Sequence, residues 1–272
     1  MLYYLQVVLM NEYMKSAIAT HAWHEFIYCE NNEDRKKFLS SMVEDFPVKI
    51  DSSEPAAIYV DDFMLPVVEE SLKPVDARVQ SIAREYLSFT LVAAMVEQTI
   101  RQNMLEELNT KMARFINSVN RLYISDEDFY ISDVTGLLDV LKKSKEFYKK
   151  HYIELMKTGE WTGDFSTIPI SFMECSMFIP SYKRALGRSS HFSMILDYQG
   201  SGAVVSQKAV NGLVTKRIAG DAAMKVVCQP EEWRVFHDLN GVLAEDIHDY
   251  SSIDLDGSFR EYVKKLSLNR IE

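Results

Sequence analysis

The stretch His191-Phe192-Ser193-Met194-Ile195-Leu196-Asp197 decides the fold of this chain. It is a short apolar run that ends in an acid, as strands buried in a parallel sheet commonly are. Helical spacing follows over residues 204–218, and a second apolar run covers residues 223–228. Apolar runs that alternate with helical periods predict a parallel α/β sheet. Because ligands bind at the carboxyl ends of such strands, Asp197 is the first candidate site residue.

Two earlier runs extend the same pattern toward the amino terminus. Residues 24–29 and 56–60 are mostly apolar and predict two more strands, the second closed by Asp61 and Asp62. Between them, residues 35–46 place their apolar side chains on one helical face, and Pro47 ends that helix. Strand, helix and strand in this order are typical of a nucleotide-binding domain.

A long helical segment separates the early strands from the later ones. Residues 75–120 predict two long helices with a bend near Arg101, and residues 132–157 and 170–186 predict further helices. The expected organisation therefore has three parts. Residues 1–74 and 191–272 form the two halves of an α/β domain, and residues 75–190 form a helical insertion or subdomain.

Composition limits the class of protein. The chain has 272 residues, of which 47% are hydrophobic, and a formal net charge of -10, which argues against a surface made to bind nucleic acid throughout. The cysteines are odd in number and far apart, so we expect buried, reduced thiols: Cys29, Cys175 and Cys228. Residues 1–10 are apolar but short and lack a basic start, which predicts neither a signal peptide nor a membrane span. We therefore expect a cytoplasmic protein with no membrane partner.

The loop after the first predicted strand stands where a phosphate-binding loop would lie. Such a loop, G-x-x-x-x-G-K-[ST], cradles phosphates with backbone N–H groups and binds them with its lysine. Residues 30–37 here contain no glycine, serine or threonine, and three acids there would repel a triphosphate. Lys36 or Lys37 is the only candidate for the lysine.

Asp197 and Tyr198 stand where a strand would present magnesium ligands. In ATPases an acid at the strand end holds the metal, and a following carboxylate orients the attacking water. Tyr198 follows Asp197 here and cannot act as a carboxylate base. Asp197 is thus either a retained metal ligand or, as is commoner for a lone acid at a strand end, a structural cap.

Together these motifs resemble AAA+ P-loop ATPases of the STAND and origin-recognition-like type, over about residues 24–62 and 190–257. The resemblance implies a P-loop-NTPase-like parallel sheet flanked by helices, with a large helical insertion and degenerate Walker A and Walker B motifs. Gln207 and Asn211 match the helix after Walker B. Arg217 matches, by position, an arginine that reaches a neighbouring subunit's nucleotide, although a solvated helix end is the alternative. His248-Asp249-Tyr250 resembles a loop-to-strand motif and is expected to be structural.

A basic run with interleaved aromatic residues covers residues 142–150. Such a run is either a local patch for nucleic acid or a solvated helix face. No metal-binding spacing of histidines or cysteines occurs, so we predict no metal site of that kind.

The sequence leads to three hypotheses. The first is a catalytically degenerate ATPase-like subunit without a cofactor, which acts as a scaffold or regulatory partner of an active ATPase or an effector in bacterial defence or DNA transactions. The alternative is a weak or unusual ATPase that uses ATP and magnesium through Lys36 or Lys37 and Asp197. A stand-alone regulatory protein is the third.

Overall fold

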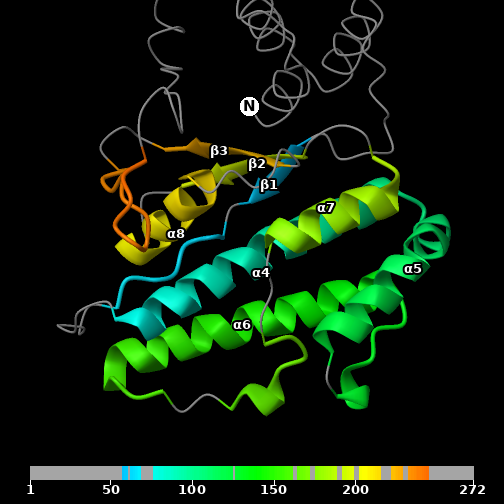
Figure 1. Ribbon diagram of the computed structural model, residues 1–272, viewed down its shortest axis with the longest axis horizontal. Helices are drawn as coiled ribbons and strands as arrows, with labels where there is room; N and C mark the ends of the chain where they lie inside the picture. Colours follow the sequence, from blue (N-terminus) through cyan, green and yellow to red (C-terminus); the bar gives the residue numbers. More distant parts are fainter. Residues whose placement is uncertain are drawn as a thin grey trace, which may run out of the picture.

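The computed structural model describes residues 57–60, 62–68, 76–124, 126–161, 164–171, 175–188, 192–198, 202–215, 222–228 and 232–244. This part of the chain is a mostly helical α/β structure with a three-stranded parallel sheet and five α-helices (Figure 1). The strand predicted over residues 24–29 and the helix predicted over residues 35–46 lie outside the described residues.

The sheet joins segments that are far apart in the chain. Its strands are β1 (Ala57–Val60), β2 (Phe192–Asp197) and β3 (Ala222–Val227), in the order β1-β2-β3. Both pairings are parallel, with Ile58 opposite Met194 and Met194 opposite Met224. All three strands lie within a residue of the positions predicted from the sequence. The long helical segment is therefore the connection between two neighbouring strands, β1 and β2.

The described helices follow the predicted periodicity closely. They are α4 (Ala77–Gln102), α5 (Leu105–Tyr123), α6 (Val134–Thr158), α7 (Cys175–Leu186) and α8 (Val204–Thr215), with short 3-10 turns at Glu127–Phe129 and Phe165–Thr167. The predicted bend near Arg101 is a complete break, because Asn103 and Met104 adopt extended backbone angles.

The prediction for α7 was too long at its start. The helix begins at Cys175, and residues 170 and 171 are not helical although Ile170 is buried. The apolar side chain of Ile170 fitted the helical spacing of the residues that follow, although its backbone is not helical. None of the helices in the described ranges is long and apolar enough to cross a membrane.

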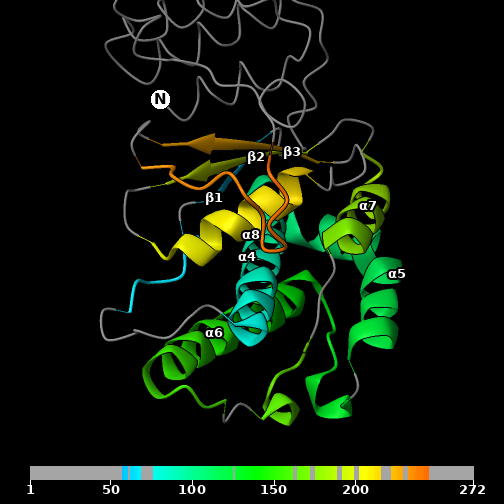
Figure 2. The same ribbon diagram turned by 60° about the vertical axis from the view of Figure 1, so that its left-hand side comes forward.

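Helix α4 lies at the centre of the structure. Figures 1 and 2 show α4 and α8 against one face of the sheet, with α6 packed along the far side of α4. Residues 85–93 of α4 are all buried, since the helix has neighbours on both sides. Ile58 and Val60 of β1 and Met194 and Leu196 of β2 point into the same core.

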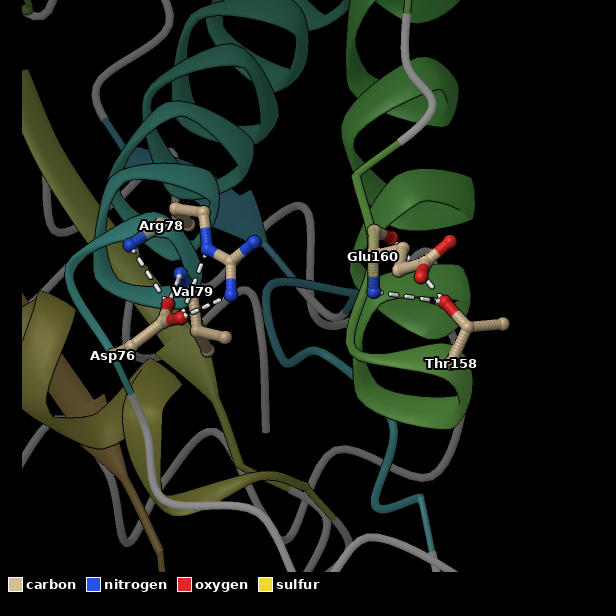
Figure 3. A network of polar contacts seen from close by, with 5 residues as sticks. All are labelled: Asp76, Arg78, Val79, Thr158 and Glu160. Atoms are coloured by element: carbon tan, nitrogen blue, oxygen red, sulfur yellow. Dashed lines mark hydrogen bonds and ion pairs between the residues drawn. The ribbon is translucent and has the colours of Figure 1, made fainter.

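Helices α4 and α6, the two longest in the described part of the chain, pack side by side and antiparallel, so the start of α4 lies beside the end of α6. Asp76 caps α4: its carboxylate accepts hydrogen bonds from the backbone N–H of Arg78 (2.9 Å) and of Val79 (3.1 Å). Beside it, α6 ends at Thr158, whose hydroxyl oxygen accepts from the backbone N–H of Glu160 at 3.0 Å (Figure 3). The positive end of one helix dipole thus lies beside the negative end of the other.

Candidate functional site

The carboxyl end of the sheet carries the first candidate residue, Asp197, which is half-buried at the end of the central strand. Tyr59 pairs with Ile195 in the register, and side chains two residues apart share a face, so Tyr59 and Asp197 point to the same side. The Tyr59 hydroxyl donates a hydrogen bond to Asp197 Oδ2. The carboxylate that was a candidate for magnesium binding therefore accepts a hydrogen bond from a neighbouring strand.

Tyr198 occupies the position where an ATPase of the resembled type carries its catalytic carboxylate. Its backbone N–H donates to the carbonyl oxygen of Val227 at 2.8 Å, which continues the pairing of β2 with β3. Its ring is buried and packs edge-to-face on Trp233, with the centroids 5.8 Å apart. Tyr198 is a packing residue here.

The residues required for magnesium are not assembled in the described part of the chain. Within it, no group of three or more histidine, cysteine, aspartate or glutamate side chains could hold a metal ion. Lys36 and Lys37, the candidates for phosphate binding, lie outside the described residues, as do Arg217 and His248-Asp249-Tyr250. The structure therefore places only Asp197 among the predicted site residues.

A second polar centre lies just beyond the end of β1. Asp62 Oδ2 lies 3.0 Å from Lys145 Nζ and 3.6 Å from Lys149 Nζ, both on α6. The Tyr86 hydroxyl of α4 donates to the Asp62 carbonyl oxygen at 3.2 Å. Partial burial works against the charge, but hydrogen bonds and attraction from Lys145 and Lys149 outweigh it and hold the pKa of Asp62 below its ordinary value. Burial and the nearby Asp62 raise the pKa of the Tyr86 hydroxyl above its usual range.

A charged cleft of about 390 Å³ opens between this centre, α4 and α6. Its lining comes from the end of β1 and from the facing sides of the two helices: Tyr59, Val60, Asp62, Thr90, Ala93, Ala94, Glu97, Gln98, Arg101, Lys142 and Lys145. Glu97 Oε1 lies 3.0 Å from Arg101 Nη2 and 3.2 Å from Lys142 Nζ. The Gln98 amide donates to the Tyr59 carbonyl oxygen at 2.9 Å and so ties α4 to β1.

The basic run over residues 142–150 is spread over three sides of α6. Lys142, Lys145 and Lys149 are three, four and seven residues apart, share one face, and reach the carboxylates at the cleft. Tyr148 is buried and stacks on Phe89 of α4, with the ring centroids 5.7 Å apart. Phe147 lies at a third side, edge-to-face with His151 at 4.1 Å. The rings and the lysines of this run therefore do not form one surface.

Gln207 and Asn211 of α8 hold the segment that follows β3. Gln207 Nε2 donates to the Glu232 carbonyl oxygen at 2.9 Å. Asn211 Nδ2 donates to the carbonyl oxygens of Val235 and His237 at 2.7 and 3.1 Å. These two amides, selected by resemblance alone, secure residues 232–244 against α8.

Sequence reasoning missed Tyr59 and Glu97 as site residues and treated Asp62 only as a strand end. The spacing of Glu97 and Arg101, four residues apart on a helix, could have indicated their ion pair. Nothing local links Tyr59 with Asp197, which are 138 residues apart.

Comparison with known proteins finds no matching family model, no matching curated protein and no matching solved structure.

Proposed function

We propose that this chain is an ATPase-like subunit that does not hydrolyse nucleotide and acts as a scaffold or regulatory partner within a multiprotein complex. The expected partner is an active ATPase or an effector, in bacterial defence or DNA transactions. The proposal keeps the P-loop-NTPase-like fold as its premise and assigns the chain a role in assembly.

One observation carries the proposal: the end of the central strand is built for packing. Asp197 accepts a hydrogen bond from Tyr59, and Tyr198 is buried on Trp233 where a carboxylate base would be needed. The parallel order β1-β2-β3, with an acid ending the middle strand, supports an ATPase-like ancestry. The sequence of residues 30–37 supports the proposal as well, because it has none of the glycines that a phosphate-binding loop needs.

Calorimetry with ATP and magnesium tests the loss of nucleotide chemistry. Without a glycine-rich cradle, no row of backbone N–H groups replaces the water around the phosphates, so we expect a dissociation constant weaker than ~1 mM. The matched variant is Asp197→Ala. Micromolar binding that disappears in Asp197→Ala would overturn the proposal and favour the alternative, a weak ATPase that uses Lys36 or Lys37 and Asp197.

A second experiment tests assembly through Arg217. A chain without its own phosphate cradle can still donate an arginine to the nucleotide of a neighbour, and such a residue can raise turnover by ~10³ or more. The complex is purified from the native host, its partner chains are identified, and it is reconstituted with Arg217→Ala or with the control Lys216→Ala. We expect hydrolysis by the complex to fall only with Arg217→Ala. Equal turnover in both would return Arg217 to the role of a helix-end charge.

A further inference from the structure

We infer that the charged cleft between α4, α6 and the end of β1 binds a small phosphorylated compound. Asp197 is not part of the lining of this cleft, and the inference does not depend on the proposed function.

The charges around the cleft are unequal in number. Three cations of the lining, Arg101, Lys142 and Lys145, meet two carboxylates, Asp62 and Glu97. A fourth cation, Lys149, lies outside the lining, with its Nζ 3.6 Å from Asp62 Oδ2. Each carboxylate receives its two cations on a single oxygen atom. Because ammonium and guanidinium groups carry three and five donors, these ion pairs within the described residues use only a few of them, and the others can turn to a ligand.

The remaining acids of this part of α6 do not restore the balance inside the cleft. Asp139 and Glu146 are exposed and are not part of its lining. The cleft therefore presents an excess of positive charge on an otherwise acidic protein. A ligand of opposite charge gains charge-assisted hydrogen bonds there.

The size of the cleft favours a small ligand. Its volume of about 390 Å³ lies near the lower end of the range for small-molecule sites. Its lining combines apolar residues, Val60, Ala93 and Ala94, with the charged groups. Lys145 is only 15% exposed, whereas Lys142 and Arg101 are 48% and 72% exposed, so these two side chains can move to meet a ligand.

The same geometry disfavours a nucleic-acid strand. Binding of single strands combines a basic groove with aromatic rings on which bases stack. The Tyr148 ring is buried between α6 and α4, where it stacks on Phe89. Phe147 lies on another side of α6, against His151. Among the cations, Lys145 Nζ lies over the buried Tyr86 ring, 5.6 Å from its centroid. Neither ring of the basic run is part of the cleft lining, which suits a compact phosphate group.

Calorimetry with inorganic pyrophosphate, without magnesium, tests the site in the full chain. The double variant Arg101→Gln with Lys142→Gln removes two exposed cations, and we expect roughly tenfold weaker binding. The matched control, Lys143→Gln with Lys150→Gln, removes the same charge from exposed positions of α6 that do not line the cleft. Equal affinities in the two double variants, or no binding to the wild type, would overturn the inference.

A variant that is expected to bind pyrophosphate more tightly provides a second test, because unfolding could explain weaker binding but not tighter binding. Glu97→Gln removes the carboxylate that competes for Arg101 and Lys142, so pyrophosphate should bind several times more tightly than to the wild type. Unchanged or weaker binding to a folded Glu97→Gln variant would contradict the assignment. Tighter binding of a single-stranded oligonucleotide than of pyrophosphate would replace the small ligand by nucleic acid.

The ATP titration keeps this site distinct from a nucleotide site. ATP binding that survives the Arg101 and Lys142 substitutions but is lost in Asp197→Ala belongs to the end of the central strand. Pyrophosphate binding that survives Asp197→Ala but is weakened by the Arg101 and Lys142 substitutions belongs to the cleft. Either proposal can therefore fail while the other stands.

Discussion

Tyr59 on β1 donates a hydrogen bond to Asp197 on β2, across neighbouring parallel strands and over a separation of 138 residues. The bond lies on the face of the sheet opposite α4, because the alternate residues Ile58, Val60, Met194 and Leu196 point into the core shared with that helix. It joins the strands on either side of the long helical segment. Asp197 thus has a structural partner whatever its role toward a ligand.

The first prediction concerns this bond. Tyr59→Phe keeps the ring and removes the donor, so we expect a loss of about 1 kcal/mol in the free energy of unfolding. Asp197→Ala should cost a similar amount and leave the chain folded. Since the two changes remove the same bond, the double variant should cost less than the sum of the single ones. Urea denaturation measures all three, and strictly additive losses would contradict a shared contact.

The second prediction concerns the response to acid. Because the folded-state pKa of Asp62 is lowered from 3.8, its carboxylate stabilises the folded chain above that pH and loses this contribution as pH falls through the folded value. Asp62→Asn should therefore lower the unfolding midpoint at pH 7, and its difference from the wild type should shrink below about pH 4. Thermal unfolding across this range measures the effect.

A matched control for Asp62 is Asp139→Asn, which removes an exposed acid of α6. This variant should lower the unfolding midpoint at pH 7 less than Asp62→Asn does. A gap between wild type and Asp62→Asn that stays constant from pH 7 to pH 3 would show that Lys145 and Lys149 do not stabilise the charged form.

The third prediction concerns the hydrogen bonds from Asn211 of α8 to the backbone of residues 232–244. Asn211→Ala removes the donor to the carbonyl oxygens of Val235 and His237, and because both hydrogen bonds are only partly buried we expect a cost of about 1 kcal/mol. Hydrogen exchange should accelerate in this segment and stay unchanged in α5. Lys208→Ala on the same helix is the control. Equal exchange in the two variants would argue that packing alone holds the segment.

The fourth prediction concerns a close approach of two segments. A Cβ atom at Gly202 would lie 2.7 Å from Met64 Cβ, so Gly202→Ala must push residues 62–68 away from the start of α8. We expect destabilisation of about 1–3 kcal/mol, with partial recovery when Met64→Gly is added. Differential scanning calorimetry measures both variants.

The control for Gly202 is Gly136→Ala. A Cβ atom at Gly136 would lie 3.5 Å from its nearest neighbour, Asp133 Oδ1, which is ordinary contact. Since alanine favours a helix more than glycine does, this change should leave stability unchanged or raise it by up to ~1 kcal/mol. Equal destabilisation in both glycine variants would contradict the close approach.

Local pattern predicted most of the described elements because each one needs only its own residues. The run that ends at Asp197 forms β2, and residues 75–120 form two helices with a break after Gln102. Strand alternation and helical periodicity report burial along the chain, so they place elements well. They failed at Ile170, which is buried outside a helix and so fitted the apolar pattern of the helix that follows.

The sequence by itself thus determined the α/β class, the strands and the helical segment between them. Only the tertiary structure decided which side chains meet: Tyr59 with Asp197, Lys145 with Asp62, and Asn211 with the backbone after β3. These contacts join residues from separate elements, and their distances depend on how the elements pack. Periodicity records which face of an element is buried, but not which neighbour buries it.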